Sequence, residues 1–99
     1  MTINDMLEIM QKIKELYPRK DVTDSPTIWG MRKAQYDGHE VLIFELCDGY
    51  TFVSESLKKT KKITYALVEI FLVTGDHRFN YAIYIMSEDD FHNSEYGNL

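Results

Sequence analysis

The chain has 99 residues, of which 44% are hydrophobic and 27% charged, and these proportions are typical of one ordinary globular domain over residues 1 to 99. The formal net charge of −5 argues against direct binding of nucleic acid, because proteins that neutralise phosphates present a net basic face. No apolar run reaches the roughly 18 residues that a membrane-spanning helix needs, since Glu69 and the segment GDHR interrupt the best candidate.

The first predicted element is an amphipathic helix over residues 3 to 17. Apolar side chains recur on one stripe at three- and four-residue spacing: Ile3, Met6, Leu7, Met10, Ile13 and Tyr17. Thr2 and Asp5 have the Thr-x-x-Asp spacing of a capping box, and Pro18 disfavours helical backbone at Tyr17. We expect this helix to bury its apolar stripe against the elements that follow.

After the polar segment RKDVTDSP the hydrophobic period changes to two, which predicts strands. Two Asp-Gly dipeptides, at 37–38 and 48–49, separate three alternating runs, and this pattern is a strong hairpin signal because both residues tolerate positive φ. The predicted strands cover about 28–36, 39–46 and 50–55. As two-residue turns, the dipeptides place Phe44 opposite both Met31 and Val53.

Two further strands are predicted over about 63 to 74 and 79 to 86. The first run is rich in β-branched and aromatic residues, which favours a strand, although a buried helix stays open as the alternative. With Asp76-His77 as the turn, Leu72 lies opposite Tyr81 and Ile70 opposite Ile83. In the acidic tail, residues 87 to 99, Ser87 and Asp90 repeat the capping-box spacing and predict a short C-terminal helix.

These elements predict an α+β fold, with the N-terminal helix packed on a five-stranded antiparallel meander. The helix can cover one face of the sheet only, and the alternation of side chains assigns residues to faces. The face expected under the helix carries Trp29, Met31, Leu42, Phe44, Leu46, Val53, Val68, Ile70, Leu72, Tyr81, Ile83 and Ile85. The opposite face is aromatic and contains a few charges: Arg32, Val41, Ile43, Glu45, Tyr50, Phe52, Tyr65, Leu67, Glu69, Phe71, Ala82, Tyr84 and Met86.

This aromatic sheet face is the predicted binding site, because large exposed apolar patches mark interaction sites on soluble proteins. The partner-binding candidates are Tyr50, Phe52, Tyr65, Leu67, Phe71 and Tyr84, with Glu88, Asp89 and Asp90 steering a partner that has a basic surface. Three alternatives stay open. The C-terminal segment with Phe91 and Tyr96 could fold over the face, the strands could curl into a barrel, or the face could form a homodimer.

The sequence contains no motif that indicates catalysis, and no metal or cofactor is predicted. His-Glu-x-x-His, Cys-x-x-Cys, the phosphate-binding loop and the Gly-x-Ser-x-Gly elbow are all absent. His39 and Cys47 could approach each other across a hairpin, but a lone cysteine is usually a small packing residue. We therefore expect a protein that is not an enzyme.

A cytoplasmic location is predicted from the cysteine count and the N-terminal residues. The single cysteine cannot form an intramolecular disulfide, and the start MTINDMLEIM lacks the basic and apolar regions of a secretory signal. Both features are typical of a protein that works in a reducing compartment.

The segments MTINDMLEIM, YDGHEV and SEDDFHNSEY together resemble the small acidic anti-CRISPR inhibitors carried by phages. The resemblance implies a non-enzymatic protein that binds a nucleic-acid-handling effector in the host cytoplasm, but it assigns no residues, and the basic run KKTKK departs from it. We predict a protein-binding inhibitor or adaptor. The alternative is a homodimeric structural or chaperone-like protein that uses the aromatic sheet face as its interface.

Overall fold

A computed structural model describes residues 2–17, 26–47, 63–72 and 79–99. Two helices and four strands follow one another along these residues: α1 (Ile3–Leu16), β1 (Thr27–Tyr36), β2 (His39–Cys47), β3 (Thr64–Leu72), β4 (Phe79–Ser87) and α3 (Glu88–Asn93). The α+β class is confirmed. Neither helix of the described part is long and apolar enough to cross a membrane.

Helix α1 begins at the predicted capping box. The Asp5 amide donates to Thr2 Oγ1 at 3.1 Å, and the Thr2 amide donates to Asp5 Oδ2 at 2.8 Å, so both N-terminal donors are satisfied. The helix ends at Leu16, where Tyr17 takes extended backbone angles. Ile9 and Ile13 are its buried residues and point at the sheet.

The four strands form one antiparallel sheet in the order β1-β2-β3-β4. Asp37 (φ 48°) and Gly38 (φ 82°) form the predicted tight turn between β1 and β2, with both residues at positive φ. Thr64–Leu72 is a strand, so the alternative of a buried helix in this region is wrong. The β-branched and aromatic side chains pack on the pleated surface as their propensity suggests.

Strand β2 lies between β1 and β3, which corrects the predicted five-stranded meander. Phe44 is opposite Met31 on β1, as predicted, but its partner on the other side is Ala66 of β3 and not Val53. The predicted strand over 50–55 and its turn at 48–49 lie outside the described residues. The sheet of the described part therefore has four strands, and β3 takes the place expected for that strand.

Two further predictions of register are wrong. A β-bulge shifts the β1–β2 ladder between Ile28 and Gly30, so Trp29 packs on the aromatic face and not under α1. In the second hairpin Ile70 lies opposite Tyr81, where Ile83 was expected. This second shift is by two residues, and because side chains alternate with period two, every residue of β3 and β4 keeps its predicted face.

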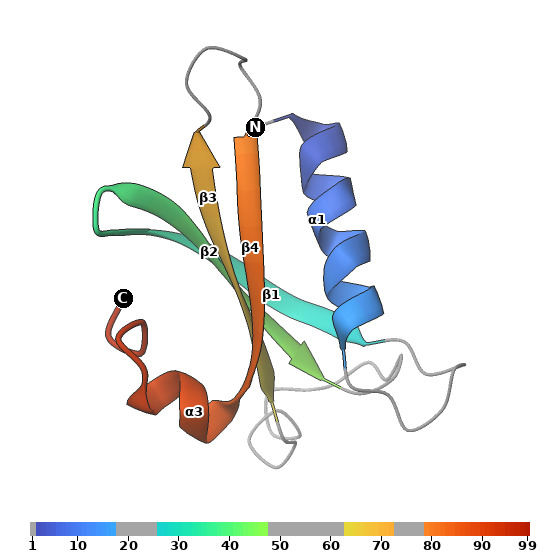
Figure 1. The fold of residues 1–99 in the computed structure, drawn as a ribbon. Helices are drawn as coiled ribbons and strands as arrows, with labels where there is room; N and C mark the ends of the chain where they lie inside the picture. Colours follow the sequence, from blue (N-terminus) through green and yellow to red (C-terminus); the bar gives the residue numbers. More distant parts are fainter. Residues whose placement is uncertain (1, 18–25, 48–62, 73–78) are drawn as a thin grey trace.

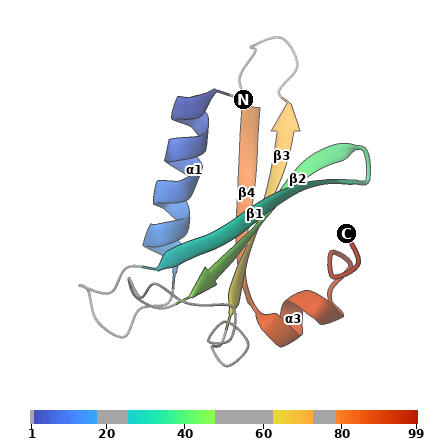
Figure 2. The same ribbon diagram turned by 180° about the vertical axis from the view of Figure 1, so that it is seen from behind.

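Each face of the sheet carries its own core, with α1 on one side and α3 on the other, as Figures 1 and 2 show. The first core cluster lies under α1 and is formed by Ile9, Ile13, Tyr17, Leu42, Phe44, Leu46, Ala66, Val68 and Ile70. The second core cluster lies under α3 and is formed by Val41, Ile43, Ile63, Tyr65, Leu67 and Phe91. The sheet is thus the middle of three layers.

Candidate partner-binding surface

Helix α3 covers the part of the predicted open face around Tyr65, at the end of the sheet where β3 begins (Figure 1). Ser87 caps the helix by accepting a hydrogen bond from the Asp90 amide at 3.2 Å, as its spacing predicts. Phe91 then stacks on Tyr65 with ring centroids 4.1 Å apart and planes 8° apart. The alternative in which the C-terminal part folds over the sheet is confirmed, and the candidates Tyr65 and Leu67 are buried inside the domain.

Residues 94–99, which we call the C-terminal segment, are held on the same face by polar contacts. The Tyr96 hydroxyl donates to Glu69, the Tyr36 hydroxyl donates to Glu95, and the Arg32 guanidinium donates to the main-chain oxygen of Leu99. The hydrogen bond to Glu69 raises the pKa of Tyr96, because ionisation of the phenol would place a second negative charge beside the carboxylate. The protonated Tyr96 hydroxyl therefore stabilises the docked segment through this hydrogen bond.

Glu69 is also close to His39, at the end of the sheet near the Asp37-Gly38 turn. His39 Nε2 lies 3.6 Å from Glu69 Oε2 and makes no hydrogen bond within the described part of the chain. The His39 ring contacts Phe71, with centroids 4.9 Å apart. Glu69 and His39 are thus close neighbours, and both side chains are largely buried.

Cys47 lies at the opposite end of β2, so the predicted approach of His39 and Cys47 across a hairpin is wrong.

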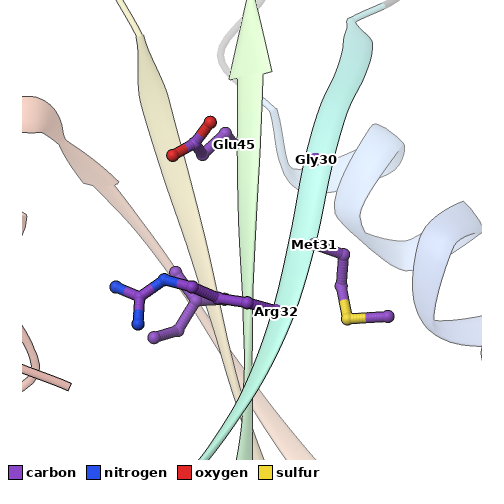
Figure 3. A pocket seen from close by; sticks show the side chains of 5 residues that line it. Gly30, Met31, Arg32 and Glu45 are labelled. Atoms are coloured by element: carbon purple, nitrogen blue, oxygen red, sulfur yellow. The ribbon is translucent and has the colours of Figure 1, made fainter.

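A shallow depression of about 210 Å³ lies on strands β1 and β2 and is lined by Gly30, Met31, Arg32, Ile43 and Glu45. Figure 3 shows the side chains of Arg32 and Glu45 on one side of the sheet and Met31 on the other. Small-molecule sites usually have volumes of roughly 300 to 1,000 Å³. The depression of about 210 Å³ lies below this range.

Two of the predicted aromatic residues stay at the surface, beyond the edge of α3. Phe71 is 40% exposed and Tyr84 is 46% exposed, and alternation places both side chains on the α3 side of the sheet. Tyr84 lies opposite Leu67 in the ladder, next to the buried second core cluster. Tyr50 and Phe52, the remaining aromatic candidates, lie outside the described residues.

The three acidic candidates form the first turn of α3. Asp89 and Asp90 are exposed, and Glu88 is partly exposed, with Oε1 3.9 Å from His92 Nε2. Carboxylates at this position interact favourably with the positive end of the helix dipole, so the turn is stable as well as acidic. Tyr84 lies on β4, four residues before Glu88, and we call Tyr84, Glu88, Asp89 and Asp90 together the β4–α3 surface.

Helix α1 exposes a second apolar group that the sequence pattern had assigned to the core. Ile3 is 80% exposed and Leu7 is 58% exposed. A depression of about 320 Å³ beside them is lined by Thr2, Ile3, Met6, Lys33 and Glu40. The buried stripe is centred on Ile9 and Ile13; at about 100° per residue, Ile3 then falls on the flank of the stripe and Leu7 on the far side of the helix.

No cluster of three or more His, Cys, Asp or Glu residues that could hold a metal ion occurs in residues 2–17, 26–47, 63–72 and 79–99. The chain matches no known family model, no curated protein and no solved structure. The resemblance to phage inhibitors stays a prediction from the sequence.

Proposed function

We propose that this protein is a non-catalytic binding module that acts as an inhibitor or adaptor, and that it contacts its partner through the β4–α3 surface. The observation that carries the proposal is the position of Tyr84, a large aromatic residue that is 46% exposed on the same face as α3 and four residues before its acidic first turn. Aromatic side chains with a polar tip are frequent energetic centres of protein interfaces.

The charge of this surface favours a partner with a basic face. Glu88, Asp89 and Asp90 add three carboxylates beside Tyr84, in a chain whose formal net charge is −5. Complementary charge raises the rate of encounter and disfavours acidic partners. A basic face that normally holds nucleic-acid phosphates fits this requirement, and a host effector of that kind, in the cytoplasm, is the partner we propose.

The experiment is a capture assay with the immobilised chain and a host lysate, analysed by mass spectrometry. The test variants are Tyr84→Ala and the triple variant Glu88→Gln, Asp89→Asn, Asp90→Asn. The control variant raises the formal net charge by the same three units, but at exposed residues of α1: Asn4→Lys, Gln11→Lys and Glu15→Gln. Capture should weaken with both test variants and with added salt, and should survive in the control.

The proposal fails if a partner is retained equally by the wild type and both test variants. It also fails if the control variant loses the partner as completely as the triple variant, because binding would then follow net charge and not the β4–α3 surface. Circular dichroism of each variant checks that α3 is still folded.

A homodimer through the aromatic sheet face is the second candidate function. In its favour are Phe71 and Tyr84, the two large aromatic residues of that face that stay exposed in the described part. Against it is the burial of Tyr65 and Leu67 under α3, which removes the centre of the expected interface. A dimer of that kind would bury little apolar area, so we rank it below binding of a different protein.

A further inference from the structure

The two edge strands of the described sheet differ in how they resist pairing with another strand. β1 has a bulge between Ile28 and Gly30, and it carries Arg32 and Lys33. Bulges and charged side chains, lysine above all, are the devices by which natural sheets block the addition of further strands. β1 is therefore a protected edge.

β4 has none of these devices. Its sequence, FNYAIYIMS, contains no charged residue, no proline and no glycine. Its nine residues pair with β3 from Phe79 to Ser87 without a register shift, so the strand is regular along its whole length. Long, regular and uncharged edge strands are the ones that add a further strand.

The side chains of β4 also leave part of the first core cluster uncovered. Tyr81, Ile83 and Ile85 pack against that cluster but are only partly buried. Tyr81 is fixed by its hydroxyl, which donates to Glu8 Oε1 of α1 at 3.1 Å. The apolar row thus lies at the rim of the core, with α1 beside it, and a neighbouring strand would complete its burial.

We propose that β4 pairs with β4 of a second copy of this chain, antiparallel, with Ile83 opposite Ile83. A two-fold axis perpendicular to a sheet places one residue opposite itself, and Ile83 is the middle residue of Phe79–Ser87. This register pairs every residue of the strand. It joins the two sheets into one and keeps both α1 helices on the same side.

The side chains that this register places opposite each other are compatible on both faces of the sheet. Tyr84 lies opposite Ala82 of the second copy, so each large ring meets a small residue, and Tyr81 lies opposite Ile85. Aromatic residues opposite β-branched ones are among the favourable cross-strand pairs. Since the strand is uncharged, no like charges meet in the ladder.

The acidic turns do not oppose this pairing. Each Glu88 lies five residues from Ile83, and the two copies run in opposite directions, so the turns are separated by ten residues of strand. At about 3.4 Å per residue this is roughly 34 Å, well beyond the Debye length of about 8 Å at physiological salt. Repulsion between the two acidic turns is therefore screened.

The first test is sedimentation velocity of the full chain from micromolar to submillimolar concentration, with Ala82→Lys and Gln35→Lys compared. Ala82→Lys puts a charge opposite Tyr84 of the second copy, whereas Gln35→Lys makes a similar change on exposed β1. We expect a dimer whose dissociation constant rises at least tenfold in Ala82→Lys and stays unchanged in Gln35→Lys. A wild-type chain that is monomeric throughout would overturn the proposal.

The second test measures the register of the proposed β4–β4 pairing, and it does not rely on a variant that weakens the dimer. A nitroxide spin label on Asn80→Cys, an exposed position, allows pulsed electron paramagnetic resonance to measure the distance between copies. Six residues of strand separate the two Asn80 positions, which gives about 20 Å along the strand direction. A dimer with a clearly longer separation would mean that the copies meet through another surface, and the edge pairing would be rejected.

This inference does not depend on the proposed function, although Tyr84 belongs to both surfaces. The triple amide variant of α3 should lose the basic partner and keep the dimer, and Ala82→Lys tests the dimer without changing an acidic residue. Either proposal can fail alone.

Discussion

Phe91 of α3 lies almost parallel to Tyr65 of β3, with 4.1 Å between ring centroids and 8° between ring planes. Both side chains are buried, and together they join the C-terminal part of the chain to the second core cluster. This contact buries the part of the predicted open face that carries Tyr65 and Leu67. It also makes the stability of the domain depend on a helix of only six residues, which would be marginal without tertiary packing.

Phe91→Ala should therefore destabilise the protein strongly. Truncation of a buried phenylalanine costs about 3 to 5 kcal/mol, and the loss should appear in urea unfolding followed by the fluorescence of Trp29, which packs on the same cluster. Phe71→Ala is the matched control, because Phe71 is 40% exposed on the same face and its loss should cost about 1 kcal/mol or less. Equal losses in the two variants would contradict the packing of α3.

Gly97→Ala should disrupt the C-terminal segment. A Cβ on Gly97 would lie 2.5 Å from the main-chain oxygen of His92 and 2.9 Å from that of Phe91, distances that force the backbone to move. Overpacking of this kind typically costs about 1 to 3 kcal/mol. Gly30→Ala is the control, because the nearest atom to its Cβ would be Glu45 Oε2 at 3.8 Å, and thermal unfolding should separate the two variants.

The stability of the protein should fall at alkaline pH in a way that depends on Tyr96. The hydrogen bond to Glu69 raises the pKa of Tyr96 above its ordinary value of 10.0, so the folded state holds this proton more tightly than the unfolded state. The stabilisation is complete below about pH 10 and is lost as the pH rises above that value. Urea unfolding at a series of alkaline pH values should show a smaller decline in Tyr96→Phe than in the wild type; an identical decline would argue against the hydrogen bond.

The capping box of α1 should make an acid-dependent contribution to stability. The Thr2 amide and hydroxyl lower the pKa of Asp5 from its ordinary value of 3.8, so the folded state favours the carboxylate. This contribution is present above about pH 4 and is lost as the pH falls through the lowered pKa. Thermal unfolding between neutral and acidic pH should show that the wild-type advantage over Asp5→Asn shrinks at low pH.

Thr2→Ala tests the same cap at neutral pH. Loss of an N-cap hydroxyl typically costs about 1 kcal/mol, and the decrease in melting temperature should appear in circular dichroism. Thr2→Ser, which keeps the hydroxyl, is the control and should retain most of the stability. A Thr2→Ala protein with an unchanged melting temperature would show that α1 is held by its packing alone.

Part of the candidate site could be predicted from residue types alone. Alternation correctly placed Phe71 and Tyr84 on one face of the sheet, and the spacing of Ser87 and Asp90 located the start of α3. The burial of Tyr65 was not predictable in the same way, because it depends on Phe91, which is 26 residues further along the chain. Local sequence patterns predict which face of the sheet a side chain occupies, but they do not predict which distant segment packs against that face.

The sequence by itself determined the elements whose signals are local: the capping box at Thr2, the hairpin turn at Asp37-Gly38 and the start of α3 at Ser87. Their hydrogen bonds and backbone angles involve residues close together in the chain. Only the tertiary structure decided that β2 pairs with β3, that a bulge moves Trp29 to the other face, and that α3 buries Tyr65 on the aromatic sheet face. These outcomes depend on competition among distant segments for the same apolar surface, and that competition is resolved by packing of the whole domain.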